Sequence, residues 1–171
     1  MNWTPEQLPS LAGHRYAITG GNPGLGLEAA KILTGKGAHV TITARSEKKA
    51  EGALAEIRRQ VPQASADFVL LDLTRPDRIK EAAEALKQHP LQAVINNAGV
   101  MQPPFTKTDE GYELQFATNH LGHFRLNSAL FHHLENTSGR IVVVSSIAHK
   151  FGKIQFDALM FEKKYDPTQS Y

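Results

Sequence analysis

The sequence predicts an α/β fold: a doubly wound parallel sheet between two layers of helices, a three-layer α/β/α arrangement. Short apolar or β-branched runs alternate with stretches of helical periodicity over most of the 171 residues. Strands that alternate with helices at this rhythm form βαβ units, which make neighbouring strands parallel. The length suits a single domain, 1–171, which can bury a core without disulfides or metals.

Each element has its own signal. The expected strands are Tyr16–Thr19, Val40–Thr43, Phe68–Leu71, one beginning at Val94-Ile95, and Ile141–Val144. The expected helices are Gly24–Lys36, Glu47–Gln60, Pro76–Leu86 and a long stretch Glu110–Leu134, each with apolar residues at helical spacing. Gly35 and Gly37 end the first helix, Pro62 ends the second, and Pro76 opens the third.

Composition excludes several classes of protein. There are no cysteines, which excludes a disulfide scaffold, thiolate zinc sites, iron–sulfur clusters and a catalytic thiol. Lys and Arg number 19 against 17 Asp and Glu. The basic clusters Arg45–Lys49, Arg58–Arg59 and Lys163–Lys164 are short and scattered, so we interpret them as solvated helix faces and expect no nucleic-acid partner.

Metal and membrane sites are not expected either. His120, His123 and His132-His133 fall on one predicted helix without a converging carboxylate or thiolate, so we expect no metal. No apolar run approaches the roughly 18 residues of a membrane span, and the N-terminus lacks a signal-peptide pattern. We therefore expect a cytoplasmic protein.

The first chemical motif is a glycine-rich loop. Residues Thr19–Gly26 read TGGNPGLG, directly between the first strand and the first helix. Such a loop lets bare backbone approach a pyrophosphate, which then faces the helix N-terminus. A strand–helix turn that needs glycine only for positive φ gives a similar pattern, so the loop by itself leaves both interpretations open.

Four further motifs follow at the ends of later elements. Asp72-Leu73 follows the third strand, Asn96–Gly99 the fourth, Asn119 lies in the long helix, and Ser145-Ser146 ends the fifth strand. With TGxxxGxG, this order resembles the short-chain dehydrogenase/reductase family from Arg15 to the last residue. The runs FATNHLGHF and SSIAHKFGKI look like its retinol-dehydrogenase-like branch. The resemblance implies a Rossmann-type sheet, NAD(P)(H), and hydride transfer between an alcohol and a carbonyl.

The resemblance also implies roles for individual residues. Asn119 would hold a relay water through its backbone carbonyl, Ser146 would polarise the substrate carbonyl, and Tyr171 would be the general acid/base. Asp72 would contact the adenine, although a carboxylate capping the next turn gives the same pattern. The predicted cofactor contacts are Gly20, Asn22, Gly24, Leu25, Gly26, Arg45, Ser46, Asp72, Leu73, Asn97, Ala98 and Gly99.

The end of the second strand predicts the choice of cofactor. NAD-preferring proteins place an acid there for the ribose 2′-hydroxyl, whereas this chain reads Thr43-Ala44-Arg45-Ser46. Arg45 can bind a 2′-phosphate with paired N–H donors, and Ser46 can add a hydroxyl. We expect NADP(H) in preference to NAD(H); the alternative is that Arg45 is an exposed strand-end cation.

The chain departs from the family pattern at two places. The family tyrosine belongs to YxxxK, and this sequence ends at Tyr171, so the fold is expected to be incomplete at its C-terminal end, without the rest of the catalytic helix and the substrate lid. A polypeptide ending there is expected to bind cofactor weakly, to show little activity and to expose an apolar edge strand. Pro23 removes one N–H from the phosphate loop.

Three functions remain open. An NADP(H)-dependent oxidoreductase acting on a small lipophilic carbonyl or alcohol is favoured, because a binding module has no need of Asn119, Ser146 and Tyr171. The alternatives are a non-catalytic NADP(H)-binding or interaction module, and a protochlorophyllide-reductase-like enzyme, whose cysteines this chain lacks. The long helix suits a homodimer face or core packing equally, with these apolar residues: Leu121, Phe124, Leu126, Leu130, Phe131 and Leu134.

Overall fold

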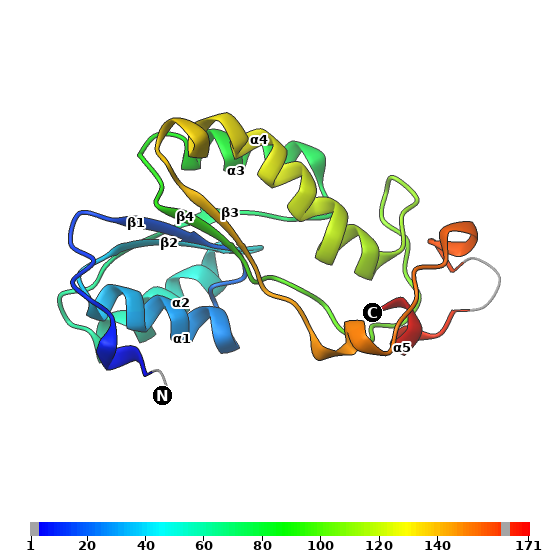
Figure 1. The fold of residues 1–171 in the computed structure, drawn as a ribbon, viewed down its shortest axis with the longest axis horizontal. Coiled ribbons are helices and arrows are strands. Elements are labelled where there is room, and N and C mark those ends of the chain that lie inside the picture. The colour runs from blue at the N-terminus through cyan, green and yellow to red at the C-terminus, as the bar shows by residue number, and fades with distance from the viewer. Residues whose placement is uncertain (1–3, 162–164) are drawn as a thin grey trace.

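A computed structural model describes residues 4–161 and 165–171, and it contains one five-stranded parallel sheet (Figure 1). The strand order is β3-β2-β1-β4-β5, as a doubly wound fold requires. The strands are β1 (Arg15–Ile18), β2 (His39–Ala44), β3 (Ser65–Leu70), β4 (Ala93–Asn96) and β5 (Arg140–Val143). The predicted α/β/α class is confirmed; the basic pair Lys163–Lys164 lies outside the described residues.

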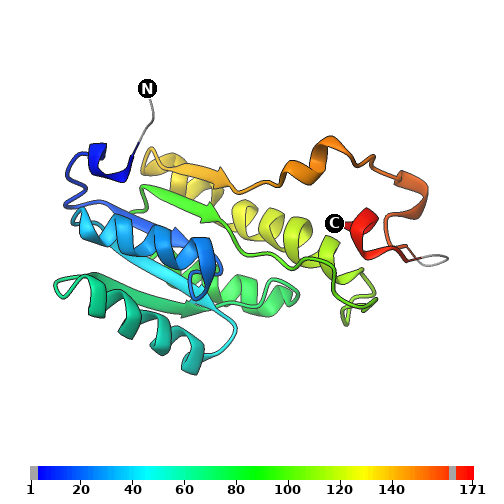
Figure 2. The same cartoon turned by 90° about the horizontal axis from the view of Figure 1, so that it is seen from below.

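Helices cover both faces of the sheet (Figure 2). They are α1 (Gly24–Gly35), α2 (Glu47–Gln60), α3 (Pro76–Leu86), α4 (Gly122–Asn136) and the short α5 (Pro167–Ser170). Gly37, at φ +89°, ends α1 as predicted, because its N–H bonds the Thr34 carbonyl at 2.9 Å. The next N–H, of Ala38, bonds the Leu33 carbonyl at 3.1 Å, which completes a Schellman motif.

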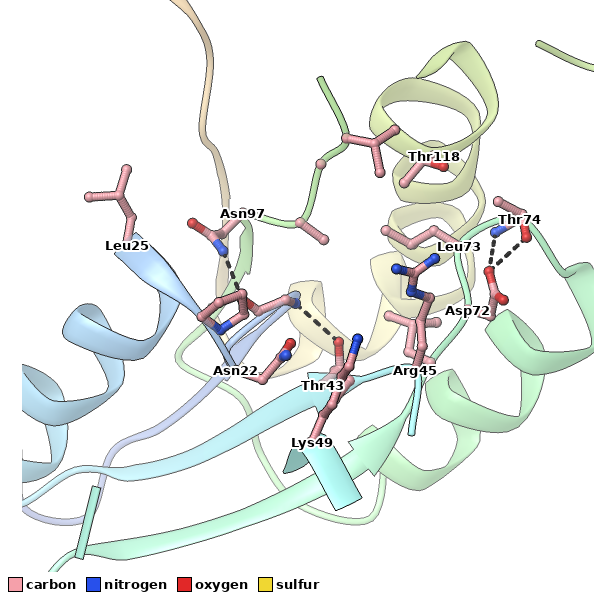
Figure 3. A pocket seen from close by; sticks show the side chains of 17 residues that line it. Asn22, Leu25, Thr43, Arg45, Lys49, Asp72, Leu73, Thr74, Asn97 and Thr118 are labelled. Atoms are coloured by element: carbon pink, nitrogen blue, oxygen red, sulfur yellow. Dashed lines mark hydrogen bonds between the residues drawn. The ribbon is translucent and has the colours of Figure 1, made fainter. Parts of the chain in front are cut away.

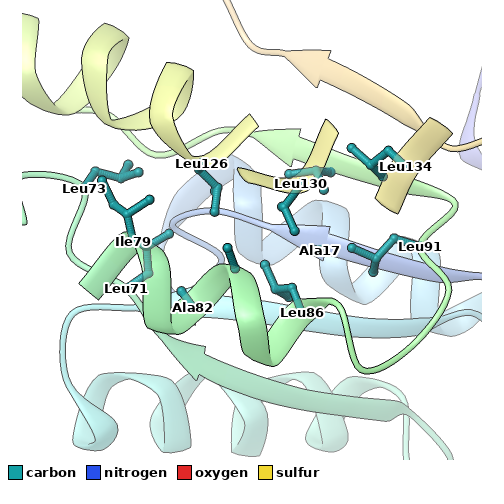
Figure 4. Packing of buried hydrophobic residues seen from close by; sticks show 12 residues of the cluster. Ala17, Leu71, Leu73, Ile79, Ala82, Leu86, Leu91, Leu126, Leu130 and Leu134 are labelled. Carbon is teal, nitrogen blue, oxygen red and sulfur yellow. The ribbon is translucent and has the colours of Figure 1, made fainter. Parts of the chain in front are cut away.

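Successive residues of β1 supply the two halves of the core. Ala17 faces α3 and α4, where it packs with Ile79, Leu126 and Leu130 (Figure 4). Ile18, on the opposite face, packs in the cluster that α1 and α2 cover. Because β1 lies in the middle of the sheet and is buried on both faces, its last residues lead directly from the core to the loop that follows.

The long helix is shorter than predicted. It begins at Leu114 rather than at Glu110, because Gly111 has φ +85° in a turn closed by the Thr108 and Tyr112 backbones. Residues Phe116–Leu121 then form a π-helical segment that runs directly into α4. Such segments are rare and commonly occur at functional sites. This one contains Asn119.

The apolar residues of the long helix divide between two environments. Leu126, Leu130 and Leu134 are buried against α3 and the sheet, whereas Phe124 and Phe131 are exposed by 64% and 54%. Strand β5 and the segment after it also expose apolar side chains, Val143 by 66% and Phe151 by 85%. Core packing therefore accounts for three of the six apolar residues, and the homodimer stays a prediction.

The described part of the chain contains neither a membrane-spanning helix nor a cluster of metal ligands. No helix in residues 4–161 and 165–171 has the length and hydropathy to cross a bilayer. Within the same residues, no three His, Cys, Asp or Glu side chains are grouped so that they could hold a metal ion.

The packing of α4 predicts the effect of truncating two adjacent side chains. Leu130→Ala should lower the free energy of unfolding by about 2–5 kcal/mol, because it leaves a cavity in the α3–α4 core. Phe131→Ala, the neighbouring control, should change it by less than about 1 kcal/mol. Urea unfolding followed by circular dichroism measures both, and equal losses would contradict this assignment of the core face.

Candidate functional site

The carboxyl ends of four strands meet around one cavity of about 390 Å³ (Figure 3). Its walls are the loop after β1, the end of β2, the turn after β3 and the loop after β4. The cavity lies where the strand order reverses, between β1 and β4. In open α/β sheets that crevice is where ligands bind, so fold and cavity point to the same place.

The glycine loop forms one wall by close approach of backbones. Gly20 and Gly24 have φ +64° and +58°, which other residues rarely adopt. Gly26 is needed for a different reason: a Cβ there would lie 2.5 Å from the Asn97 Nδ2 and 2.6 Å from the Gly20 carbonyl oxygen. The α1 N-terminus is thereby held beside the loop after β4, where its first N–H groups favour an anion.

The two loops are joined through Thr19 and Asn97. The Thr19 Oγ1 accepts the N–H groups of Asn97 at 2.9 Å and of Ala98 at 3.0 Å. In return, the Asn97 side-chain amide donates to the carbonyls of Thr19 at 3.0 Å and of Gly20 at 3.2 Å. The backbone of Asn97–Gly99 thus passes along the cavity in a fixed position.

The opposite wall carries two cations. Arg45 and Lys49 both reach into the cavity (Figure 3), and neither makes a hydrogen bond or an ion pair with any described residue. The one carboxylate in the lining, Asp72, is turned toward Thr74, whose N–H and O–H it accepts at 2.9 and 2.7 Å. Two unpaired cations beside a bare glycine loop fit a dinucleotide that carries an additional phosphate.

Nine of the predicted cofactor contacts line the cavity: Gly20, Asn22, Leu25, Arg45, Asp72, Leu73, Asn97, Ala98 and Gly99. Gly24, Gly26 and Ser46 do not. Gly26 is buried behind the loop, Gly24 is an exposed residue with positive φ, and Ser46 is the exposed residue that precedes α2. Leu25, at the start of α1, is 76% exposed.

Sequence reasoning missed several lining residues: Pro23, Thr43, Ala44, Lys49, Leu71, Thr74, Val100 and Thr118. Lys49 matters most: it belongs to the basic cluster Arg45–Lys49, which is exposed as expected, and it also lines the cavity. The signal was present, because Lys49 is the third residue of the helix that starts directly after Arg45-Ser46. One helical turn carries its side chain back toward the strand end.

The three predicted catalytic residues lie on separate segments. Asn119 is held by Val100, whose N–H and C=O each pair with the Asn119 side-chain amide at 2.8 Å. The Ser146 Oγ accepts the Ala148 N–H at 3.1 Å, at the start of a short 3-10 turn. Tyr171, which follows α5, is 40% exposed. Among the described residues no hydrogen bond joins these three side chains, so their shared site stays a prediction.

The segment that carries Tyr171 is tied to the start of the long helix. The buried Gln115 accepts the Gln102 N–H through Oε1, and its Nε2 donates to the Pro167 carbonyl at 3.0 Å and to the Ser170 hydroxyl. The Tyr165 hydroxyl donates to the Pro103 carbonyl at 2.8 Å. These contacts bring residues 165–171 against the loop after β4, although they lie about 60 residues apart in sequence.

Behind the cavity, His123 is almost fully buried beside Thr19 and Asn119. Burial lowers the pKa of its imidazole, because the charged form loses water. The neighbouring His120 also lowers it, while the hydrogen bond to the Asn119 carbonyl opposes the shift. Burial therefore favours the neutral form of the His123 ring.

The fold and the site together define a Rossmann-type nucleotide-binding α/β class. The family model for short chain dehydrogenases matches residues 15–158. The chain belongs to the short-chain dehydrogenase/reductase family, whose members use NAD(P)(H).

Individual relatives agree with this family. The chain is 40% identical to retinol dehydrogenase 12 of Mus musculus over 98% of its own length and 53% of that protein, and 40% identical to the chloroplastic short-chain dehydrogenase TIC 32 B of Brassica napus over 90% and 52%. It thus spans about half the length of these relatives.

Solved structures agree as well. An uncharacterised protein from Mycobacterium paratuberculosis is 33% identical and has a TM-score of 0.88, over 100% of this chain and 60% of that one. The actinorhodin polyketide ketoreductase solved with NADPH is 29% identical and has a TM-score of 0.68, over 80% and 54%.

Two glycines with opposite environments test the loop geometry. Gly26→Ala should lower the free energy of unfolding by about 1–3 kcal/mol, because the new Cβ meets backbone and the Asn97 amide. Gly52→Ala in the exposed middle of α2, where a Cβ meets nothing within 4 Å, should raise it by about 0.5–1 kcal/mol. The pair is compared by thermal and urea unfolding. A neutral Gly26→Ala would show that the close approach is wrong.

Proposed function

We propose that this chain is the cofactor-binding part of an NADP(H)-dependent oxidoreductase that interconverts a carbonyl and an alcohol. The observation that carries the choice of cofactor is the pair Arg45 and Lys49, two cations without a partner among the described residues at the end of β2. A 2′-phosphate would be a counter-ion for both cations. A free ribose 2′-hydroxyl would be a counter-ion for neither, and no acid other than the capped Asp72 lines this wall.

Each wall has a distinct part in holding the cofactor. The loop Gly20–Gly26 and the α1 N-terminus would take the pyrophosphate, and Asn97–Gly99 would run along the cofactor on the β4 side. One carboxylate oxygen of Asp72 accepts the N–H and O–H of Thr74. The adenine contact that the family resemblance implies for Asp72 would therefore use the other oxygen. Arg45 and Lys49 would take the 2′-phosphate, Arg45 with paired N–H donors and Lys49 as a point charge.

The chemical roles follow from the charge that develops on the substrate. The bound nicotinamide supplies or accepts the hydride. In the reducing direction the substrate oxygen becomes an alkoxide, so the Ser146 hydroxyl donates a hydrogen bond to it and the Tyr171 hydroxyl delivers a proton. In the oxidising direction Tyr171 removes that proton. Asn119, through its backbone carbonyl, orders the water that connects the tyrosine with solvent.

For the substrate we propose a small or medium-sized lipophilic carbonyl or secondary alcohol. The names of the retinol dehydrogenases 12 and 14 support an apolar substrate, as do the exposed apolar side chains Ile147 and Phe151 after Ser146. The activity of the whole protein is part of this proposal. Its location, which we expect to be the cytoplasm, is part of it as well.

Charge reversal at the end of β2 tests the choice of cofactor. The wild type should bind NADPH more tightly than NADH in calorimetric titration. Arg45→Glu should raise the Kd for NADPH by about 10- to 100-fold and Lys49→Glu by about tenfold, because charge-assisted bonds are lost. The Kd for NADH should change little.

Lys48→Glu is the matched control, since it makes the same charge change one residue away from a lining position. It should leave the Kd for NADPH within about threefold of the wild type. Equal or tighter binding of NADH by the wild type would overturn the choice of NADP(H).

Substitutions at Ser146 and Tyr171 test the proposed chemistry, with the adjacent Ser145 as the control. In the full product of the gene, Ser146→Ala and Tyr171→Phe should each lower NADPH oxidation against a panel of aldehydes and ketones by about 100-fold or more. Ser145→Ala, an exposed neighbour, should retain activity. Tight NADPH binding without turnover by the wild type would favour a binding module instead.

A further inference from the structure

A buried histidine joins the cofactor loop to the predicted catalytic asparagine. The His123 ring reaches in two directions: Nε2 lies 2.9 Å from the Thr19 Oγ1, and Nδ1 lies 3.2 Å from the Asn119 carbonyl oxygen. Thr19 directly follows β1, whereas His123 is the second residue of α4, which directly follows the π-helical segment. The ring therefore bridges elements 104 residues apart in sequence.

The hydrogen bonds at Thr19 fix which nitrogen of the ring carries the proton. A hydroxyl can accept two hydrogen bonds and donate one. The Thr19 Oγ1 already accepts the N–H groups of Asn97 and Ala98, so it has no lone pair left for a third donor. Its own proton must point outward, either to His123 Nε2 at 2.9 Å or to the Ile95 carbonyl at 3.4 Å, which is long for an O–H donor.

The shorter bond makes His123 Nε2 an acceptor. The proton of the neutral ring is then on Nδ1, from which it is donated to the Asn119 carbonyl. A single order of donors follows: Asn97 and Ala98 donate to Thr19, Thr19 to His123, and His123 to Asn119. In the opposite tautomer, Nε2–H would face the Thr19 oxygen, which has no free lone pair, and the unprotonated Nδ1 would face the Asn119 carbonyl, which is also an acceptor.

We propose that His123 is a positioning residue that sets the Asn119 carbonyl relative to the cofactor loop. Asn119 is then held at both ends, by Val100 at its side chain and by His123 at its carbonyl. The two hydrogen bonds of His123 are a property of the fold. Their use in hydride transfer rests on the proposed function. In that function, His123 fixes the direction of the Asn119 carbonyl, which orders the relay water.

The ring tautomer is the first test. Long-range ¹H–¹⁵N correlation spectra of the wild type at pH 7 should show His123 with a protonated Nδ1 and an unprotonated Nε2. Thr19→Val, which keeps the shape and removes the hydroxyl, should abolish that single tautomer. A protonated Nε2 in the wild type would overturn the proposal.

Two substitutions of His123 each preserve one of its two hydrogen bonds. In His123→Asn the amide can occupy the position of Nδ1 and donate to Asn119, while in His123→Gln the amide oxygen can occupy the position of Nε2 and accept from Thr19. Hydrogen exchange of the Val100 amide reports on Asn119, and exchange of the Asn97 and Ala98 amides reports on Thr19.

We expect His123→Gln to speed exchange at Val100 by about tenfold and to spare Asn97 and Ala98, and His123→Asn to do the reverse. The exposed His120→Gln is the control in the same helix and should change neither. Unchanged exchange at all three amides in both variants would overturn the positioning role.

A calorimetric titration of the wild type with NADPH separates the two proposals. Absence of binding by the full product of the gene, with the expected tautomer and exchange rates, would support the two hydrogen bonds of His123 and contradict the proposed function.

Discussion

The site depends most on the hydroxyl of Thr19. This one buried oxygen stands at the end of the central strand and makes close contacts with the loop after β4 and with the long helix. A buried hydroxyl without partners costs free energy, and one whose donor and acceptors are all used has only one orientation. This hydroxyl therefore fixes the relative positions of the glycine loop, the Asn97–Gly99 segment and Asn119.

The two ends of the sheet differ in how their charges are satisfied. At the amino end, Asp67 pairs with Arg15 at 3.2 Å and with His39 at 2.9 Å. At the carboxyl end, Arg45 and Lys49 have no counter-ion among the described residues, and Asp72 is turned away to Thr74. Charges that pair internally stabilise a fold, whereas charges left unpaired at a cavity are available to a ligand. This contrast is the physical basis of the proposed anion site.

Much of the arrangement could be predicted from local signals. The order and type of the strands followed from hydrophobic runs, the helix boundaries from Gly37, Pro62 and Pro76, and the cofactor wall from motifs at strand ends. What could not be predicted depends on contacts between distant segments. Gly111 moved the start of the long helix because its φ is set by a turn that periodicity does not report. The Thr19–His123 bond joins residues too far apart in sequence for any local pattern.

The central claim is that an NADP(H) cofactor binds at the carboxyl edge of this sheet. Its most direct test is a titration of the ¹⁵N-labelled chain with NADPH, followed through the backbone amide resonances. The account predicts that the shifted amides belong to residues 20–26, 45–49, 72–74 and 97–100, while Arg15, Asp67 and His89 at the opposite edge stay unchanged. Saturating NADPH that shifts no amide, or shifts only those at the amino edge, would contradict it.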